Sequence, residues 1–103
     1  MDIGSDFVSK GEDVFFVFGA INRHNVDAFC FSLMQIPRGA QLDMGDLDIE
    51  DGVAMAAIVS ALRQLRPVIL IEAPQMLAHT IYKTYMLSTD ITLIRPRFDD
   101  DFQ

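Results

Sequence analysis

The stretch "LDMGDLDIEDGVAMAAIVSALRQL" (Leu42–Leu65) begins as a short apolar segment and passes through a run of acids between two glycines. It then becomes rich in alanine and leucine. From Val53 to Leu65 there is no proline and no glycine. The apolar residues at helical spacing in this part are Met55, Ile58, Leu62 and Leu65. This pattern predicts an amphipathic helix directly after an acidic loop.

Runs of β-branched and aromatic residues lie on both sides of this stretch. "DVFFVFGAI" (Asp13–Ile21) and the core of "PVILIE" (Val68–Ile71) are nearly apolar throughout, which predicts strands buried on both faces of a sheet. "AQLDM" (Ala40–Met44) and "ITLI" (Ile91–Ile94) predict two short strands. Phe7–Ser9 is predicted as a short edge strand, and the sequence leaves open whether it pairs with this first run or with the sheet of a neighbouring chain.

Two further helices are expected. The first follows Asn25, a good N-cap residue, and ends at Pro37. Its inner face is predicted to carry Val26, Phe29, Cys30, Leu33 and Met34. The other begins at Pro74, where the missing N–H costs no hydrogen bond. Its inner face is predicted to carry Leu77, Ile81 and Tyr85.

The resulting order, β-β-α-β-α-β-α-β, predicts an α/β fold with a mixed, mostly parallel sheet of four to five strands. A chain of 103 residues matches one domain, whose core is expected at about residues 7–94. Residues 95–103, "RPRFDDDFQ", are interpreted as a frayed acidic tail.

Composition narrows the classes of function. The net charge of −7 and the pI near 4.4 disfavour nucleic acid and acidic lipid surfaces, which bind basic faces. The first residues have neither the basic start nor the apolar middle of a signal peptide, and no apolar run is long enough for a membrane span. A cytoplasmic protein is therefore expected. The single cysteine, Cys30, excludes an internal disulfide and is interpreted as a buried, inert thiol.

The acids before the long helix allow three interpretations. Asp51 and Glu50 are placed to cap the helix N-terminus. Asp46, Asp48 and Glu50 alternate as in a calcium loop, but Asp51 stands where the turn glycine belongs and the closing glutamate is absent. The third interpretation is contact with a protein partner. We expect no metal, no cofactor and no catalytic group, because neither His24 nor His79 has a partner in triad or ligand spacing.

The segment "EAPQMLAHTIYKTYML" offers a second surface. If Leu77 and Ile81 face the core, then Met76, His79 and Tyr82 form an exposed ridge along the same helix. A ridge that combines soft apolar and polar groups suits a protein contact.

The element order and the text around Asp43–Leu65 resemble a STAS domain, the fold of anti-sigma factor antagonists. Leu42–Met44 stands where the strand of that family ends, Gly52–Val53 matches the glycine-leucine pair that opens its helix, and "PVILIEAP" matches the next strand and turn. The resemblance extends from about Phe7 to Ile94. The loop is about two residues shorter than usual, and Glu50 or Asp51 stands near the serine or threonine that partner kinases phosphorylate.

The resemblance implies a non-enzymatic interaction module of bacterial signal transduction and transcription regulation. Its partner would be an anti-sigma factor or a kinase-like regulator. The residues that would bind this partner are Asp48, Glu50, Asp51, Gly52 and Val53. The alternative is a small subunit of a lipid-transport ATPase complex or of a stress-sensing assembly, bound through Met76, His79 and Tyr82. The sequence leaves open whether the chain forms a homodimer.

Overall fold

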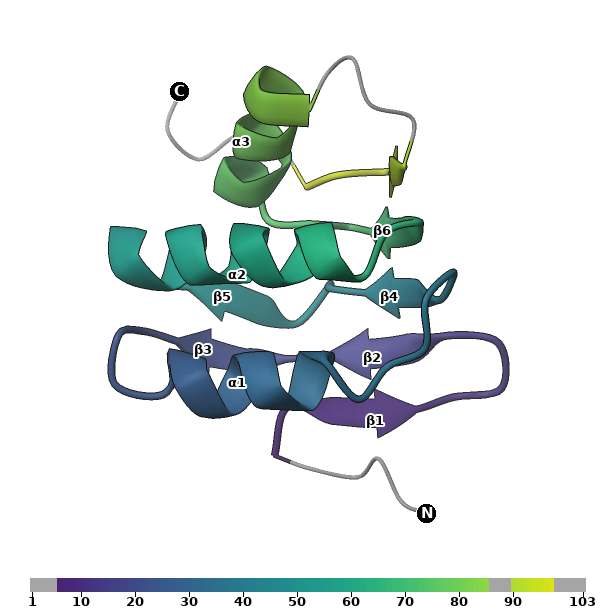
Figure 1. Cartoon of the computed structure of the whole chain (residues 1–103), viewed down its shortest axis with the longest axis horizontal. Helices are drawn as coiled ribbons and strands as arrows, with labels where there is room; N and C mark the ends of the chain where they lie inside the picture. The colour runs from purple at the N-terminus through teal and green to yellow at the C-terminus, as the bar shows by residue number, and fades with distance from the viewer. Residues whose placement is uncertain (1–5, 86–89, 98–103) are drawn as a thin grey trace.

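The computed structural model describes residues 6–85 and 90–97. Within them the chain forms a compact α/β fold, with a mixed sheet of mostly parallel strands and three helices (Figure 1). The strands are β1 (Val8–Lys10), β2 (Phe15–Val17), β3 (Gly19–Ile21), β4 (Gln41–Asp43), β5 (Leu47–Ile49), β6 (Val68–Ile71) and β7 (Ile91–Ile94), and the helices are α1 (Val26–Leu33), α2 (Gly52–Gln64) and α3 (Gln75–Tyr85). The predicted α/β class is confirmed.

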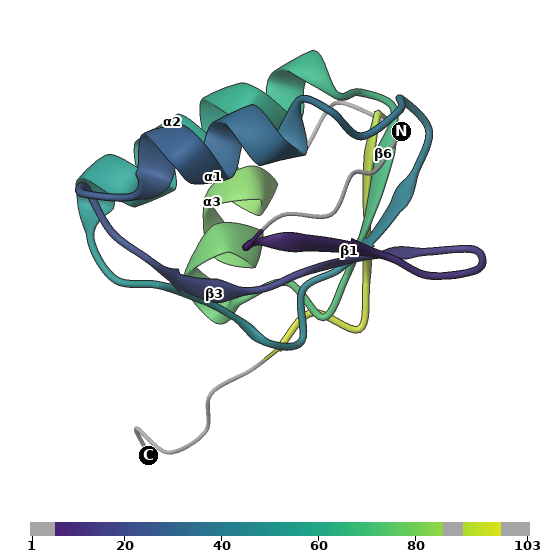
Figure 2. The same cartoon turned by 90° about the horizontal axis from the view of Figure 1, so that it is seen from below.

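The main sheet has the order β1-β2-β4-β6-β7. β1 runs antiparallel to β2, so the N-terminal edge strand pairs within its own chain, and the other neighbours are parallel. Each helix connects one parallel strand to the next in the same direction across the sheet. Crossovers that proceed in one direction across a parallel sheet and share one hand bring all the helices to the same face. Figure 2 shows α1, α2 and α3 together on one side of the twisted strands.

The predicted element order is wrong in two places. The run Asp13–Ile21 is two strands, because Phe18 separates β2 from β3. The acidic segment contains β5, which pairs in parallel with β3 as a separate two-stranded ladder. Phe16 pairs with Asp43, and Gly19 pairs with Leu47. The chain from Asp43 to Leu47 therefore holds one residue more than the chain from Phe16 to Gly19. This extra residue displaces the β3–β5 ladder from the main sheet.

The core lies between the helices and the near face of the sheet. Phe29, Leu33, Ile58, Leu62, Leu77 and Ile81 are buried as predicted. Met34 is 43% exposed, contrary to expectation, because α1 ends at Leu33. The side chain of Tyr85 lies outside the described residues. No helix in the described part of the chain is both long and apolar enough to cross a membrane.

The prediction that the strands are buried on both faces is also wrong. Phe15 and Val17 are buried against the helices, but Phe16 between them is 43% exposed. In β6 the alternation is the same, with Leu70 buried and Ile71 half-buried. Since all three helices lie on one side, no described element covers the other face of the sheet.

The described part of the expected tail is bound to the sheet. Arg97 N donates to Ala73 O at 2.9 Å, and Arg97 Nε donates to Glu72 O at 3.1 Å. Residues 98–103, the remainder of the expected tail, lie outside the described residues.

Candidate functional site

Asp51 joins the start of α2 to the turn before α1. Its Oδ1 accepts a hydrogen bond from Ala54 N at 2.8 Å, which confirms the predicted N-cap. Its Oδ2 accepts from Arg23 N at 2.9 Å, and Arg23 Nε lies 3.5 Å away. The backbone N–H of Ala54, followed by that of Arg23, lowers the pKa of Asp51. The carboxylate is thus ionised at neutral pH and directed into the protein.

The turn before α1 is organised by its own polar side chains. Asn22 Nδ2 donates to Glu50 Oε1 at 3.0 Å, and His24 N donates to Asn22 Oδ1 at 2.8 Å. The expected capping role of Asn25 is wrong, because its side chain makes no hydrogen bond to its own helix. It accepts from Asn22 N at 2.8 Å and donates to Ala20 O at 3.0 Å instead. These bonds fix the turn against the start of α2.

The other residues of the predicted docking site face solvent. Asp48, Glu50, Gly52 and Val53 are exposed, and Val53 retains 53% of its accessible surface. We call these four residues the junction surface. In Figure 1 the β5–α2 turn and the β3–α1 turn lie at the same end of the molecule. The junction surface therefore lies on the β5–α2 side of two turns that Asp51 ties together.

The acids do not converge on one point. Asp43 Oδ1 accepts from Gly45 N at 2.9 Å, while Asp48 lies on β5 and Asp51 turns into the α2 cap. In residues 6–85 and 90–97, no three His, Cys, Asp or Glu side chains are grouped to hold a metal ion.

The ridge on α3 is exposed as predicted. Met76 retains 64% and Tyr82 69% of their accessible surface, and His79 is also exposed. His24, in the turn before α1, is exposed as well.

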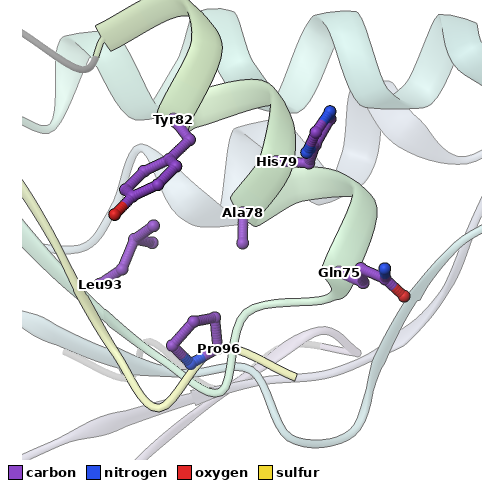
Figure 3. Close-up of a pocket in the computed structure, with 6 residues that line it drawn as sticks. All are labelled: Gln75, Ala78, His79, Tyr82, Leu93 and Pro96. Carbon is purple, nitrogen blue, oxygen red and sulfur yellow. The ribbon is translucent and has the colours of Figure 1, made fainter. Parts of the chain in front are cut away.

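A pocket of about 300 Å³ lies between this helix and the last strand (Figure 3). It is lined by Gln75, Ala78, His79, Tyr82, Leu93 and Pro96. The ring of Tyr82 extends over Leu93, whereas the imidazole of His79 points to the other side of the helix. The six lining residues include no carboxylate, hydroxymethyl or thiol group that could act with the imidazole as a nucleophile or base.

The sequence did not reveal this pocket. Leu93 and Pro96 form its wall only because β7 pairs with β6 and brings them under α3. The regular spacing of Gln75, Ala78, His79 and Tyr82 on one helix face was the one signal available. No family model, curated protein or solved structure matches this chain.

Proposed function

We propose that this chain is a non-enzymatic protein-interaction domain of the STAS type, which binds a signalling partner through the junction surface. The sequential order of β2, β4, β6 and β7, with the helices on one face, supports the proposal. The resemblance around Asp43–Leu65 supports it as well.

The main support for the proposal is the pair of backbone hydrogen bonds that Asp51 accepts. Its two carboxylate oxygens hold the β3–α1 turn and the first turn of α2 as one unit, with bonds of 2.9 and 2.8 Å. Val53, an apolar residue, projects from this unit beside the exposed acids Asp48 and Glu50. An apolar centre with a charged rim on a rigid support is typical of a protein-binding surface.

The charge defines the partner. Asp48 and Glu50 favour a basic groove, and charge complementarity of this kind governs encounter rate and partner choice. Such a partner would be an anti-sigma factor or a kinase-like regulator, in the cytoplasm. Asp43–Val53 contains no hydroxyl side chain, so loop phosphorylation does not switch this surface. The negative charge is permanent.

Charge reversal tests the proposal. The double variant Asp48→Lys/Glu50→Lys should abolish recovery of partner proteins from the source cells by the immobilised domain. Asp51 is left intact, because its loss would disturb the cap. The matched control is Glu12→Lys/Asp13→Lys, which changes the net charge equally at exposed residues of the β1–β2 turn. This control should keep the partner.

Circular dichroism and thermal unfolding would verify that both variants stay folded. Equal recovery of the partner by the wild type and the Asp48→Lys/Glu50→Lys variant would contradict the proposed surface. Equal loss in both double variants would point to non-specific attraction by net charge.

A second candidate function is that of a permanent subunit, bound through the α3 ridge. The observation in its favour is the exposure of Met76 and Tyr82 beside the 300 Å³ pocket. The partner would be a transporter ATPase subunit or a component of a stress-sensing assembly. Met76→Asp should then release a subunit that otherwise co-purifies at fixed stoichiometry. Phe31→Asp, at a 70% exposed residue of α1, is the matched control.

A further inference from the structure

The face of the main sheet that no element of residues 6–85 and 90–97 covers carries a row of side chains that alternation directs away from the helices. From the strand registers and the burial pattern, these are Ser9, Phe16, Gln41, Asp43, Ile69, Ile71, Thr92 and Ile94. Phe16 lies opposite Asp43, Asp43 opposite Ile71, and Ile71 opposite Ile94. Together they cross the sheet from one edge towards the other.

This face is more apolar than solvent contact requires. A sheet with one face on the core and one in water normally alternates between apolar and polar residues. Here Phe16 and Ile94 keep 43% and 38% of their surface exposed, and Ile69 and Ile71 are only half-buried. The same apolar runs gave the incorrect prediction of strands covered on both sides. We call Phe16, Ile69, Ile71 and Ile94 the sheet-face patch.

One carboxylate, that of Asp43, lies within the patch, and that of Glu72 lies beside it. A Cβ added to Gly45 would lie 3.0 Å from Glu72 Oε1 and 3.2 Å from Asp43 Oδ1, so both acids flank the same glycine. Asp43 is in the row itself, between Phe16 and Ile71. The guanidinium of Arg95, which is 72% exposed, reaches the other oxygen of Glu72 only at 4.0 Å. Among the described residues, the Arg97 guanidinium donates to backbone oxygens, including those of Glu72 and Met44, and to neither carboxylate, so the two side chains present carboxylate oxygens beside an apolar surface.

The size of the face limits what can cover it. Five strands about 4.8 Å apart span roughly 20 Å, and strands of three or four residues extend about 13 Å. A stable protein dimer buries about 800 Å² on each partner, roughly three times this footprint. A single helix is about 10 Å wide and covers 20 Å in about 13 residues. The dimensions thus fit one helix better than a second copy of the chain.

We propose that the sheet-face patch binds one amphipathic helix of a partner protein, with the apolar stripe of the helix on the patch and lysine or arginine beside Asp43 and Glu72. The apolar contact supplies affinity, because it removes Phe16 and Ile94 from water. The two carboxylates select helices whose flank is basic. This surface is distinct from the junction surface, and the proposal does not depend on the proposed function.

Two synthetic peptides test this inference. Each is a labelled 18-residue helix with leucine at positions i, i+3, i+4 and i+7, and the flanking residues are lysine in one and glutamate in the other. We expect the lysine peptide to bind at physiological ionic strength, as measured by fluorescence anisotropy. Its binding should shift the backbone amide resonances of β2, β4, β6 and β7. The glutamate peptide should bind at least about tenfold more weakly.

Three double variants identify the surface. Phe16→Ser/Ile94→Ser and Asp43→Asn/Glu72→Gln should each weaken binding of the lysine peptide by about tenfold or more. The amide oxygen introduced by Asp43→Asn would still accept from Gly45 N. The Asp43→Asn/Glu72→Gln variant therefore tests the charge even if Phe16→Ser/Ile94→Ser fails to fold. The control Asp48→Asn/Glu50→Gln removes the same charge from the junction surface and should change affinity less than about twofold.

Each other outcome overturns the inference. Equal weakening by Asp43→Asn/Glu72→Gln and by the control would mean non-specific charge attraction. Amide shifts confined to α2 and β5 would place the peptide on the junction surface. A dimer in sedimentation that Phe16→Ser/Ile94→Ser dissociates would make a second copy the occupant. Partner recovery by the Asp48→Lys/Glu50→Lys variant is a separate measurement, so failure of this inference and failure of the proposed function are distinguishable.

Discussion

The Nη2 group of Arg97 donates to two carbonyl oxygens, that of Met44 at 3.0 Å and that of Leu47. Both acceptors lie about fifty residues earlier in the chain. Strand β6 ends beside Met44. Met44 N still donates a hydrogen bond to Ile71 O, but the next residue, Glu72, has a positive φ of 56° and turns the chain away. The carbonyl of Leu47 on the next strand would otherwise have no strand partner on that side. One half-buried guanidinium therefore closes the edge where β4 passes into β5.

We expect Arg97→Ala to lower the free energy of unfolding by about 2–3 kcal/mol, because it removes the charge-assisted hydrogen bonds to Glu72 O and Leu47 O, whereas Met44 O still accepts from Leu47 N. Urea unfolding followed by circular dichroism would measure the change. Arg38→Ala is the control, since Arg38 Nε donates one hydrogen bond, of 2.8 Å, to Arg66 O at an exposed position. Its loss should cost no more than about 1 kcal/mol. An equal or smaller effect of Arg97→Ala would contradict the role of this side chain.

Apart from the α/β class, the features that sequence reasoning predicted correctly are local. The helix α2 follows from its periodicity, and Asp51 was recognised as its cap because capping involves residues only three positions apart. The role of Arg97 could not be predicted in this way. The acceptors of its side chain are separated from it by 25, 50 and 53 residues, and a neighbouring run of aspartates made the segment resemble a solvated tail.

The candidate site was predicted in part. The exposure of Asp48 and Glu50 followed from the polar loop, but the exposure of the apolar Val53 did not, and the inward direction of Asp51 depends on Arg23, 28 residues away. Strand β5 was missed because "LDI" is only three residues long and is set among acids and glycines, which are poor strand formers. Its pairing with β3 needs the long-range register that begins at Gly19 and Leu47.

Gly19 provides the next prediction. Its φ of +121° is inaccessible to residues with a Cβ, and an added Cβ would lie 3.2 Å from Phe7 Cδ1. The ring of Phe7 in turn packs edge-on against Phe29, with centroids 5.5 Å apart. We expect Gly19→Ala to cost about 1–3 kcal/mol of unfolding free energy. Chemical denaturation would measure it.

Gly52→Ala is the control for that substitution. Gly52 opens α2, and an added Cβ would meet nothing within 4 Å. Alanine also favours the helical conformation. This variant should leave the free energy of unfolding unchanged within about 0.5 kcal/mol or raise it slightly. Similar losses in Gly19→Ala and Gly52→Ala would contradict the assignment of strain to Gly19.

Asp51 links stability to pH. The N–H groups of Ala54 and Arg23 lower the pKa of its carboxyl below the usual 3.8. A carboxyl whose pKa is lowered by folding adds stability above its unfolded pKa and loses this contribution as the pH falls through the native value. Asp51→Asn keeps an acceptor for Ala54 N but cannot titrate. We therefore expect its melting temperature to fall less than that of the wild type between pH 7 and pH 3.

Asp51→Ala separates capping from charge. Without any acceptor for Ala54 N, this variant should melt a few degrees below the wild type even at pH 7. Parallel pH profiles of the wild type and Asp51→Asn would show that the carboxylate contributes nothing through its charge.

Cys30 is expected to react slowly. It is half-buried between α1 and α2, with Sγ 3.7 Å from Ala57 O. Burial, followed by the charge of Asp27, raises the pKa of the thiol and so reduces the reactive thiolate at pH 7–8. Reaction with a chromogenic disulfide should be several-fold slower in the native state than in urea, and Cys30, the one cysteine of the chain, gives an unambiguous signal. Asp27→Asn should accelerate the native reaction at low salt, whereas Asp13→Asn, which removes the same charge from the β1–β2 turn, should not. If the native protein reacts as fast as the unfolded protein in urea, the contact between α1 and α2 does not protect Cys30, and the expectation is wrong.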